Sequence, residues 1–118
     1  MCIRDRLVLD EQPEAGGQIF RSISTTERLR PEIFSMLGKD YQSGKKLLSS
    51  FQRSGVKYYS GTTVWLVEDD KSVFYLKNGI AHQVKAKRLL ISTGAQERPV
   101  PIPGWTLPGV MGLSLIHI

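Results

Sequence analysis

An apolar run followed by a proline-rich segment constrains the fold of this chain more than any other feature. Residues 89–91 (Leu-Leu-Ile) are continuously apolar, which is typical of a strand buried on both faces. The run ends near Thr93 and Gly94, and small residues there allow a ligand or another backbone to approach. The prolines of residues 99–108 then exclude helix and keep the chain extended. Open α/β sheets present a ligand edge in this way, although an ordinary strand followed by a stiff loop would show the same pattern.

The two ends of the chain carry a pattern that is foreign to the rest. Residues 1–6 and 113–118 can be encoded by DNA strings that are reverse complements of each other over nearly their whole length. Such strings resemble the adapter end of a transposase-based sequencing library, translated in frame. We therefore expect both segments to be sequencing-adapter scars and residues 7–112 to be the natural part of the chain.

Length, charge and cysteine content narrow the class of protein. A chain of 118 residues has room for one domain with a modest core. The only cysteine, Cys2, lies in the first expected scar, so residues 7–112 hold no disulfide or thiolate metal site. Without the scars the formal charge falls from +5 to +4, and acidic residues are interleaved throughout, which argues against a nucleic-acid partner. No apolar run has the length of a membrane span and no signal peptide is visible, so we expect a cytoplasmic protein.

The natural part begins with a strand that is apolar at first and acidic at its end. Glu11 closes this strand, and residues 12–17 form a turn that ends in Gly16 and Gly17. An acidic residue after a parallel strand can accept hydrogen bonds from a ribose diol. Paired glycines allow a pyrophosphate or a flavin ring to approach the backbone. Each feature alone also occurs at ordinary surface turns.

Three segments, in this order, carry a specific resemblance. Residues 7–21 closely resemble the second strand and following loop of FAD-dependent pyridine-nucleotide-type oxidoreductases. Residues 91–99 look like the Ala-Thr-Gly segment of that superfamily, with Ser92 in place of the alanine. Residues 101–110 narrow the resemblance to the FAD subunits grouped with hydrogen cyanide synthase, opine oxidase and hydroxyproline dehydrogenase. The resemblance covers essentially all of residues 7–112 and implies that they are a partial FAD/NAD(P)-binding domain.

This resemblance implies an α/β fold, namely a partial Rossmann-like FAD-binding domain with an inserted antiparallel β-meander. It also implies cofactor contacts on three segments. Glu11 would bind the adenosine ribose, Gln18 the flavin edge and Val64, through its backbone, the adenine. The other implied cofactor-binding residues are Gly16, Gly17, Thr93, Gly94 and Ala95.

Departures from the superfamily pattern limit what the chain can do alone. The opening Gly-x-Gly-x-x-Gly turn is absent, and the second nucleotide domain, where NAD(P) would bind, is expected after Gly112. Gln18 stands where the disulfide reductases carry a cysteine, which excludes redox-disulfide chemistry at that position. No residue is a convincing general base, and no metal ligands gather, so the catalytic residues stay unassigned.

The resemblance implies a fragment, itself inactive, of an FAD-dependent oxidoreductase. The parent protein would oxidise a small amine or amino-acid-like substrate by hydride transfer to flavin, and its partner would be an additional oxidoreductase subunit. A non-catalytic flavin-binding subunit that relays electrons within a multi-subunit dehydrogenase would carry the same motifs. A nucleic-acid-binding module would need a basic or aromatic patch that the sequence lacks. The substrate, the electron acceptor and the oligomeric state do not follow from the sequence.

Two helices are predicted between the first strand and the middle of the chain. Pro31 suits the first turn of a short helix, and Ser43 would cap a second helix that Gly55 ends. The apolar residues predicted to share a face are Ile33, Phe34 and Leu37 in the first helix, and Leu47, Leu48 and Phe51 in the second.

Four further strands are predicted, at residues 56–59, 62–67, 72–77 and 80–86. Asn78 and Gly79 separate the last two and are the strongest short hairpin signal in the chain. His82 is interpreted as a packing or surface residue, and Trp65 as a packing residue instead of a flavin contact.

Overall fold

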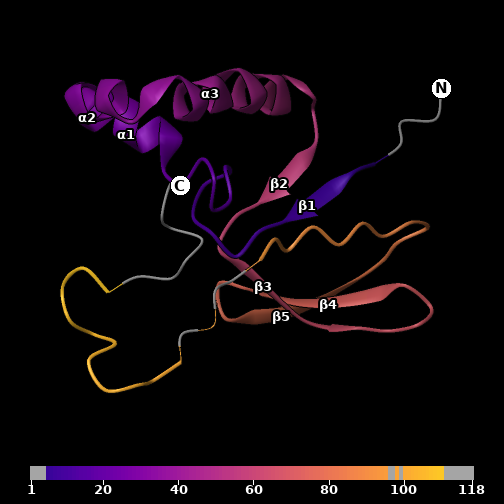
Figure 1. Cartoon of the computed structure of the whole chain (residues 1–118). Helices are drawn as coiled ribbons and strands as arrows, with labels where there is room; N and C mark the ends of the chain where they lie inside the picture. The colour runs from indigo at the N-terminus through magenta and orange to yellow at the C-terminus, as the bar shows by residue number, and fades with distance from the viewer. Residues whose placement is uncertain (1–4, 96–97, 99, 111–118) are drawn as a thin grey trace.

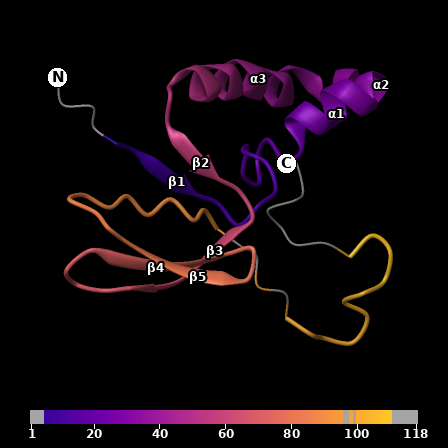
Figure 2. The ribbon, with the colours of Figure 1, turned by 180° about the vertical axis from the view of Figure 1, so that it is seen from behind.

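The computed structural model describes residues 5–95, 98 and 100–110. In chain order its elements are β1 (Leu7–Leu9), α1 (Ile23–Leu29), α2 (Pro31–Met36), α3 (Gly38–Arg53), β2 (Lys57–Tyr59), β3 (Thr62–Val67), β4 (Ser72–Lys77) and β5 (Ile80–Lys85). The helices lie on one side of the β1–β2 pair and the three-stranded sheet lies on the other, as the views from front and back show (Figures 1 and 2). This mixture of helices and sheets is compatible with the expected α/β class.

β1 and β2 form a parallel pair, in which Leu7 lies opposite Lys57 and Leu9 lies opposite Tyr59. Parallel strands need a long crossover, and α1, α2 and α3 provide it. Backbone hydrogen bonds extend the pair beyond β1, since the Asp10 N–H donates to the Tyr59 carbonyl at 3.0 Å. Both strands therefore end at the same edge, where the polypeptide leaves β1 and enters the glycine-containing loop.

Proline and glycine set the helix boundaries. Pro31 occupies the first turn of α2, as predicted, and Gly38, with a φ of 82°, stands where α2 gives way to α3. The predicted cap at Ser43 is wrong, because α3 begins five residues earlier. The Ser43 hydroxyl donates instead to the Asp40 carbonyl at 2.6 Å, a bond that serine can make inside a helix. Gly55, with a φ of 69°, follows the end of α3, which confirms the predicted stop.

The helices pack on the rest of the chain through a few contacts. Ile23, the first residue of α1, is 1% exposed. The rings of Phe51 and Tyr58 meet edge-to-face, with centroids 5.4 Å apart, and join α3 to β2. Leu37 and Leu47, however, are largely exposed, so the apolar faces predicted for the two helices are only partly right. None of the helices in the described part of the chain is long and apolar enough to cross a membrane.

Gly44 of α3 lies against Phe20 of the loop that precedes α1. It is buried, and a Cβ atom built on it would lie 2.3 Å from the nearest ring carbon of Phe20. Such a distance is a severe overlap, so only glycine fits this position without movement of the ring. No sequence pattern indicated this contact, because a glycine within a polar helical stretch has no local role.

We expect Gly44→Ala to destabilise the parent protein. Alanine at an exposed helix position is more stable than glycine by about 1 kcal/mol, but here the methyl group overlaps the Phe20 ring, and overpacking costs about 1–3 kcal/mol. The free energy of unfolding should therefore fall by up to about 2 kcal/mol in a denaturant titration. Gly44→Ala combined with Phe20→Ala should show strong coupling between the two sites. A Gly44→Ala protein with raised stability would contradict the close contact.

β3, β4 and β5 form an antiparallel sheet in sequential order, which matches the expected meander. Asn78 and Gly79 connect β4 to β5 with φ values of 52° and 75°, both positive, as a type I′ hairpin turn requires. The predicted hairpin is therefore confirmed. The register of β3 against β4 shifts between Val64 and Leu66, which leaves Trp65 as the extra residue of a β-bulge.

The two faces of this sheet differ in their surroundings. On the face toward β2, the Tyr75 ring lies 6.5 Å from the Tyr59 ring, and the Lys77 Nζ lies 3.5 Å from the centre of the Tyr59 ring. His82 stacks on Tyr75 at 5.3 Å, which agrees with its interpretation as a packing or surface residue. On the other face, Trp65 packs against Phe74 at 5.5 Å while more than half of it stays exposed.

The buried strand predicted at residues 89–91 is wrong. Residues 86–95 form no helix or strand, and Leu90 and Ile91 are 87% and 69% exposed. A strand buried on both faces needs paired neighbours and a covering layer on each side. None of the described strands pairs with this segment, which passes as an extended orange trace between β1 and the three-stranded sheet (Figure 1).

Candidate functional site

The loop that follows β1 is the centre of the candidate site. Asp10 uses both of its side-chain oxygens within the chain: Oδ1 accepts from the Gln12 N–H at 2.9 Å, and Oδ2 accepts from the Tyr58 hydroxyl at 3.0 Å. The neighbouring Glu11 is exposed, and no hydrogen bond among the described residues engages its carboxylate. Of the two consecutive acids, one is thus structural and the other is available to a ligand.

Tyr58 is held as a hydrogen-bond donor toward Asp10. Burial and then the hydrogen bond to the Asp10 carboxylate raise the pKa of Tyr58 above its ordinary value. The hydroxyl therefore keeps its proton across the physiological range. Neither residue was predicted from the sequence, because their separation of 48 positions is bridged only by the parallel register of β1 and β2.

The glycine pair has two different reasons to be glycine. The Gly16 carbonyl accepts from the Phe20 N–H at 3.0 Å, and a Cβ on Gly16 would lie 2.3 Å from the Phe20 carbonyl oxygen. Gly16 is therefore required by the loop's own turn. Gly17 has a φ of 59° and open space where a Cβ would stand, so it leaves room for an approaching group.

Gln18 is exposed beside this turn. The nearby pocket is lined by Gln12, Pro13, Glu14, Gly17, Arg21 and Ser22. Its volume is about 30 Å³, enough for a water molecule or two and far below the several hundred Å³ of a typical ligand site. The loop thus forms an open surface, and additional residues would have to surround it to make an enclosed cofactor pocket.

Backbone bonds bring the start of β3 to the same loop. The Thr62 N–H donates to the Asp10 carbonyl at 2.9 Å, and the Gly61 N–H donates to the Gln12 carbonyl at 3.1 Å. Val64 follows two residues later on β3, opposite Tyr75, and is 40% exposed. The fold therefore places the strand that carries Val64 next to the loop that carries Glu11.

The last three predicted site residues, Thr93, Gly94 and Ala95, are exposed and lie outside any helix or strand. Gly94 has a φ of 72°, and a Cβ there would meet nothing within 4 Å. None of the backbone hydrogen bonds among the described residues joins this segment to the loop after β1. Backbone hydrogen bonds thus bring the loop that carries Glu11, Gly16, Gly17 and Gln18 next to the strand of Val64, and none of the described ones ties residues 93–95 to that loop.

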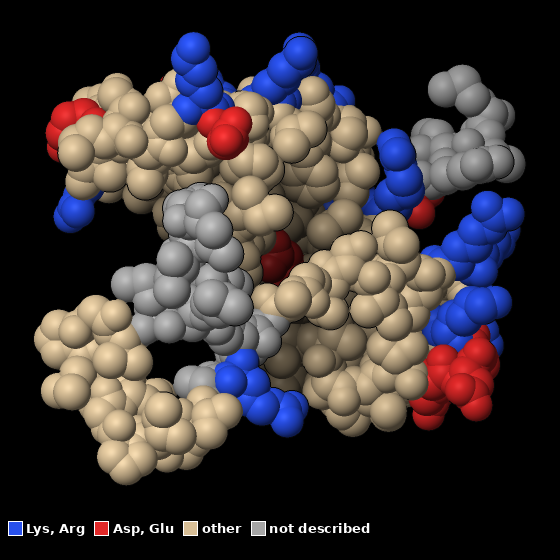
Figure 3. Space-filling model, in the orientation of Figure 1, with Lys and Arg blue, Asp and Glu red and all other residues tan. Residues whose placement is uncertain are grey.

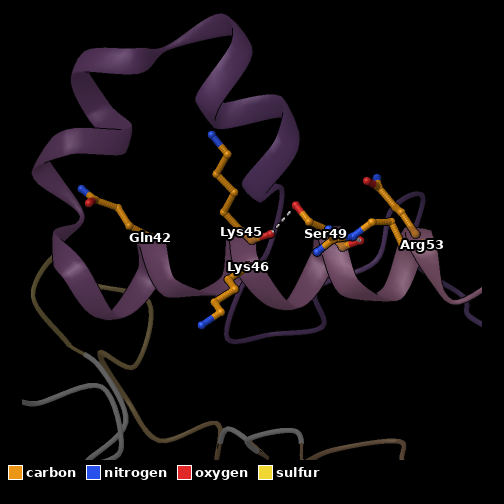
Figure 4. A pocket seen from close by; sticks show the side chains of 6 residues that line it. Gln42, Lys45, Lys46, Ser49 and Arg53 are labelled. Carbon is orange, nitrogen blue, oxygen red and sulfur yellow. Dashed lines mark hydrogen bonds between the residues drawn. The ribbon is translucent and has the colours of Figure 1, made fainter.

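A shallow depression on α3 is the other concave surface of note, lined by Gln42, Lys45, Lys46, Ser49, Gln52 and Arg53. Lys45 and Lys46 point in opposite directions (Figure 4). Lys45 pairs with Glu27 of α1, and the Ser49 hydroxyl donates to the Lys45 carbonyl at 2.9 Å. These side chains do not converge on a common point, so the depression is a solvated helix face.

Charges elsewhere do not define a second site. On the face drawn in Figure 3, basic side chains lie in small groups, mostly along the upper and right-hand edges with acidic ones near them, and they form no continuous basic patch. In the described part of the chain, no three His, Cys, Asp or Glu side chains gather as metal ligands would. Lys85 binds Asp70 at 2.7 Å and lowers the pKa of that exposed carboxyl to about 2, with help from the Ser72 backbone N–H.

A parallel strand pair joined by a helical crossover, with a glycine-containing loop between the first strand and the helices, defines a mixed α/β chain. In comparison with known proteins, this chain is similar to subunits of oxidoreductases. It is 46% identical to the A subunit of opine oxidase from Rhizobium meliloti, over 94% of this chain and 22% of that protein. The A subunit of opine oxidase from Agrobacterium tumefaciens (strain Ach5) is also 46% identical, over 94% of this chain and 23% of that protein.

A more distant relative is the HcnB subunit of hydrogen cyanide synthase from Pseudomonas protegens, 29% identical over 94% of this chain and 24% of that protein. The chain therefore spans less than a quarter of the length of these relatives. No family model matches the chain, and no solved structure matches it.

Proposed function

We propose that this chain is part of the FAD-binding domain of an oxidoreductase subunit. The proposal rests on one observation above all: Glu11 stands exposed at the carboxyl end of a parallel strand, ahead of a glycine turn. That arrangement suits a dinucleotide. Similarity to the A subunit of opine oxidase over 94% of the chain supports the oxidoreductase-subunit part of this proposal.

The residues present fit the adenosine end of FAD. The Glu11 carboxylate has the charge and the freedom to accept two hydrogen bonds from a ribose diol, and the open side of Gly17 leaves room for a phosphate or ring. The backbone near Val64 would contact the adenine and complete this half. Gln18 would bind the flavin edge, and Thr93, Gly94 and Ala95 would line the far side of the flavin. FAD, when bound, would supply the acceptor for a hydride from the carbon beside a substrate nitrogen, leaving an imine that water hydrolyses. The residues of this chain would bind FAD and orient it.

The remaining parts of the proposal concern the parent protein, with residues 1–6 and 113–118 as sequencing-adapter scars. The parent would act in the cytoplasm on a small amine or amino-acid-like substrate, together with a further oxidoreductase subunit, and NAD(P) would bind beyond residue 112. The relatives are named as subunits, which also favours a second function: a flavin-binding subunit that only relays electrons. Substrate oxidation by the parent, measured with and without its partner subunit, distinguishes the two.

Glu11→Ala in the full-length parent tests the proposed function. Loss of charge-assisted hydrogen bonds to a diol costs about 1.5–3 kcal/mol, or on the order of tenfold to a hundredfold in affinity. We therefore expect the FAD dissociation constant, measured by titration of the apoprotein, to rise by that factor. Glu11→Gln keeps a hydrogen-bond acceptor without the charge. Its FAD dissociation constant should therefore lie between those of Glu11→Ala and the parent.

Glu68→Ala is the matched control, because it removes the same charge from the turn between β3 and β4, at the other end of the sheet. It should leave FAD affinity unchanged. An unchanged dissociation constant in Glu11→Ala would show that Glu11 is an ordinary surface carboxylate and would remove the main support for the site.

A further inference from the structure

Asp10 is the most fully engaged residue near the candidate site. Its N–H donates to the Tyr59 carbonyl, its carbonyl accepts from the Thr62 N–H, and its two carboxylate oxygens accept from Gln12 and Tyr58. Every polar group of Asp10 is thus bonded, at distances of 2.9 to 3.0 Å. The residue joins β1, β2, β3 and the loop at one point.

Tyr58 connects this cluster to α3. Its ring meets Phe51 of α3 at an interplanar angle of 87°, so the position of the hydroxyl depends on how α3 packs over β2. The hydroxyl then donates to Asp10, and Asp10 holds the Gln12 N–H. The residue between Asp10 and Gln12 is Glu11, whose backbone is fixed from both sides while its carboxylate stays free.

We propose that Tyr58 is a positioning residue for dinucleotide binding, which acts through Asp10 to hold the loop so that the Glu11 carboxylate faces the ribose. The inference rests on the proposed function, and it deepens that function by connecting the site to α3. Tyr58 touches no ligand in this scheme. Its hydroxyl limits the directions that Glu11 can take, which lowers the entropy lost when the ribose binds.

Tyr58→Phe in the full-length parent tests the inference, because it removes the hydroxyl and keeps the ring on Phe51. We expect FAD to bind about three- to tenfold more weakly, the factor that corresponds to one hydrogen bond. Tyr59→Phe is the control: its ring contacts Tyr75 and Lys77, and no described hydrogen bond uses its hydroxyl. It should bind FAD as the parent does.

A double-mutant cycle separates positioning from a general structural effect. If Tyr58 acts through Glu11, Tyr58→Phe should cause no further loss of affinity in a Glu11→Ala background. Asp10→Asn, which keeps Oδ1 for the Gln12 N–H and removes the acceptor for Tyr58, should repeat this pattern. Equal FAD affinity in Tyr58→Phe and the parent, or the same loss with and without Glu11, would overturn the inference. A wild-type parent that binds no FAD would instead overturn the proposed function and the inference with it.

Discussion

Gly94→Val in the full-length parent should abolish flavin binding and leave the apoprotein largely folded. Gly94 is exposed, has a φ of 72° and meets nothing within 4 Å where a Cβ would stand. The described chain therefore has room for a side chain there, and a valine would intrude only on a bound group. The left-handed backbone adds a cost of about 1–2 kcal/mol for a residue with a Cβ, which a whole domain can survive.

Strain and steric exclusion can be separated at this position with Gly94→Asn. Asparagine adopts positive φ more readily than other residues with a Cβ, but its side chain occupies the same space as that of valine. Both variants should therefore lose flavin, by at least about a hundredfold in affinity, when the cofactor lies against Gly94. Thermal unfolding of each apoprotein, measured beside bound flavin, provides the comparison. If Gly94→Asn binds FAD normally and only Gly94→Val loses it, backbone strain explains the loss, and Gly94 is not part of the cofactor site.

The second large effect concerns the 118-residue chain by itself, which should neither retain FAD nor unfold in one cooperative step. Its accessible surface is 10455 Å², whereas a folded monomer of 13.3 kDa exposes about 6,500 Å². The radius of gyration is 17.9 Å, against about 13–14 Å for a compact domain of this length. The core of the described part contains few residues: Ile23, Val73 and Tyr75 are the buried apolar ones.

Two measurements check this expectation. Differential scanning calorimetry of the purified chain should show no sharp transition, and gel filtration should show self-association, because exposed apolar side chains and an unpaired strand edge attract other copies. Reconstitution with excess FAD followed by desalting should leave no flavin absorbance with the protein. A monomer that keeps stoichiometric flavin and melts sharply would contradict the expectation and would show that these residues suffice for the site.

The parts of the fold that could be predicted from sequence depend on local signals. Asn78 and Gly79 fix a hairpin within four residues, and Pro31 marks a helix start, since each imposes its own backbone angles. The buried strand predicted at residues 89–91 was wrong because an apolar run indicates only a preference for burial. The residues that would have to cover it lie elsewhere in the sequence. Nothing local to Ser43 indicated that Gly38 already begins the helix.

The candidate site divides in the same way. Glu11 and the glycine pair were visible because they lie within seven residues of each other in a recognisable order. The contact of Phe20 with Gly44, and the bond from Tyr58 to Asp10, depend on how the crossover folds back over the strand pair. Such contacts depend on strand register and on packing, which cannot be predicted from a single sequence.

The parallel pairing of β1 with β2 also has a consequence for synthesis. Leu7 pairs with Lys57, fifty positions later, and ribosomes add about 5–20 residues per second. The partner of Leu7 is therefore made roughly 2.5–10 s after Leu7 itself. Ser72 and Lys85, by contrast, are only thirteen positions apart, and hairpins close in about 1–10 μs. On the ribosome, β1 thus waits longest for its partner among the described strands, and a chaperone has the most time to bind its apolar residues.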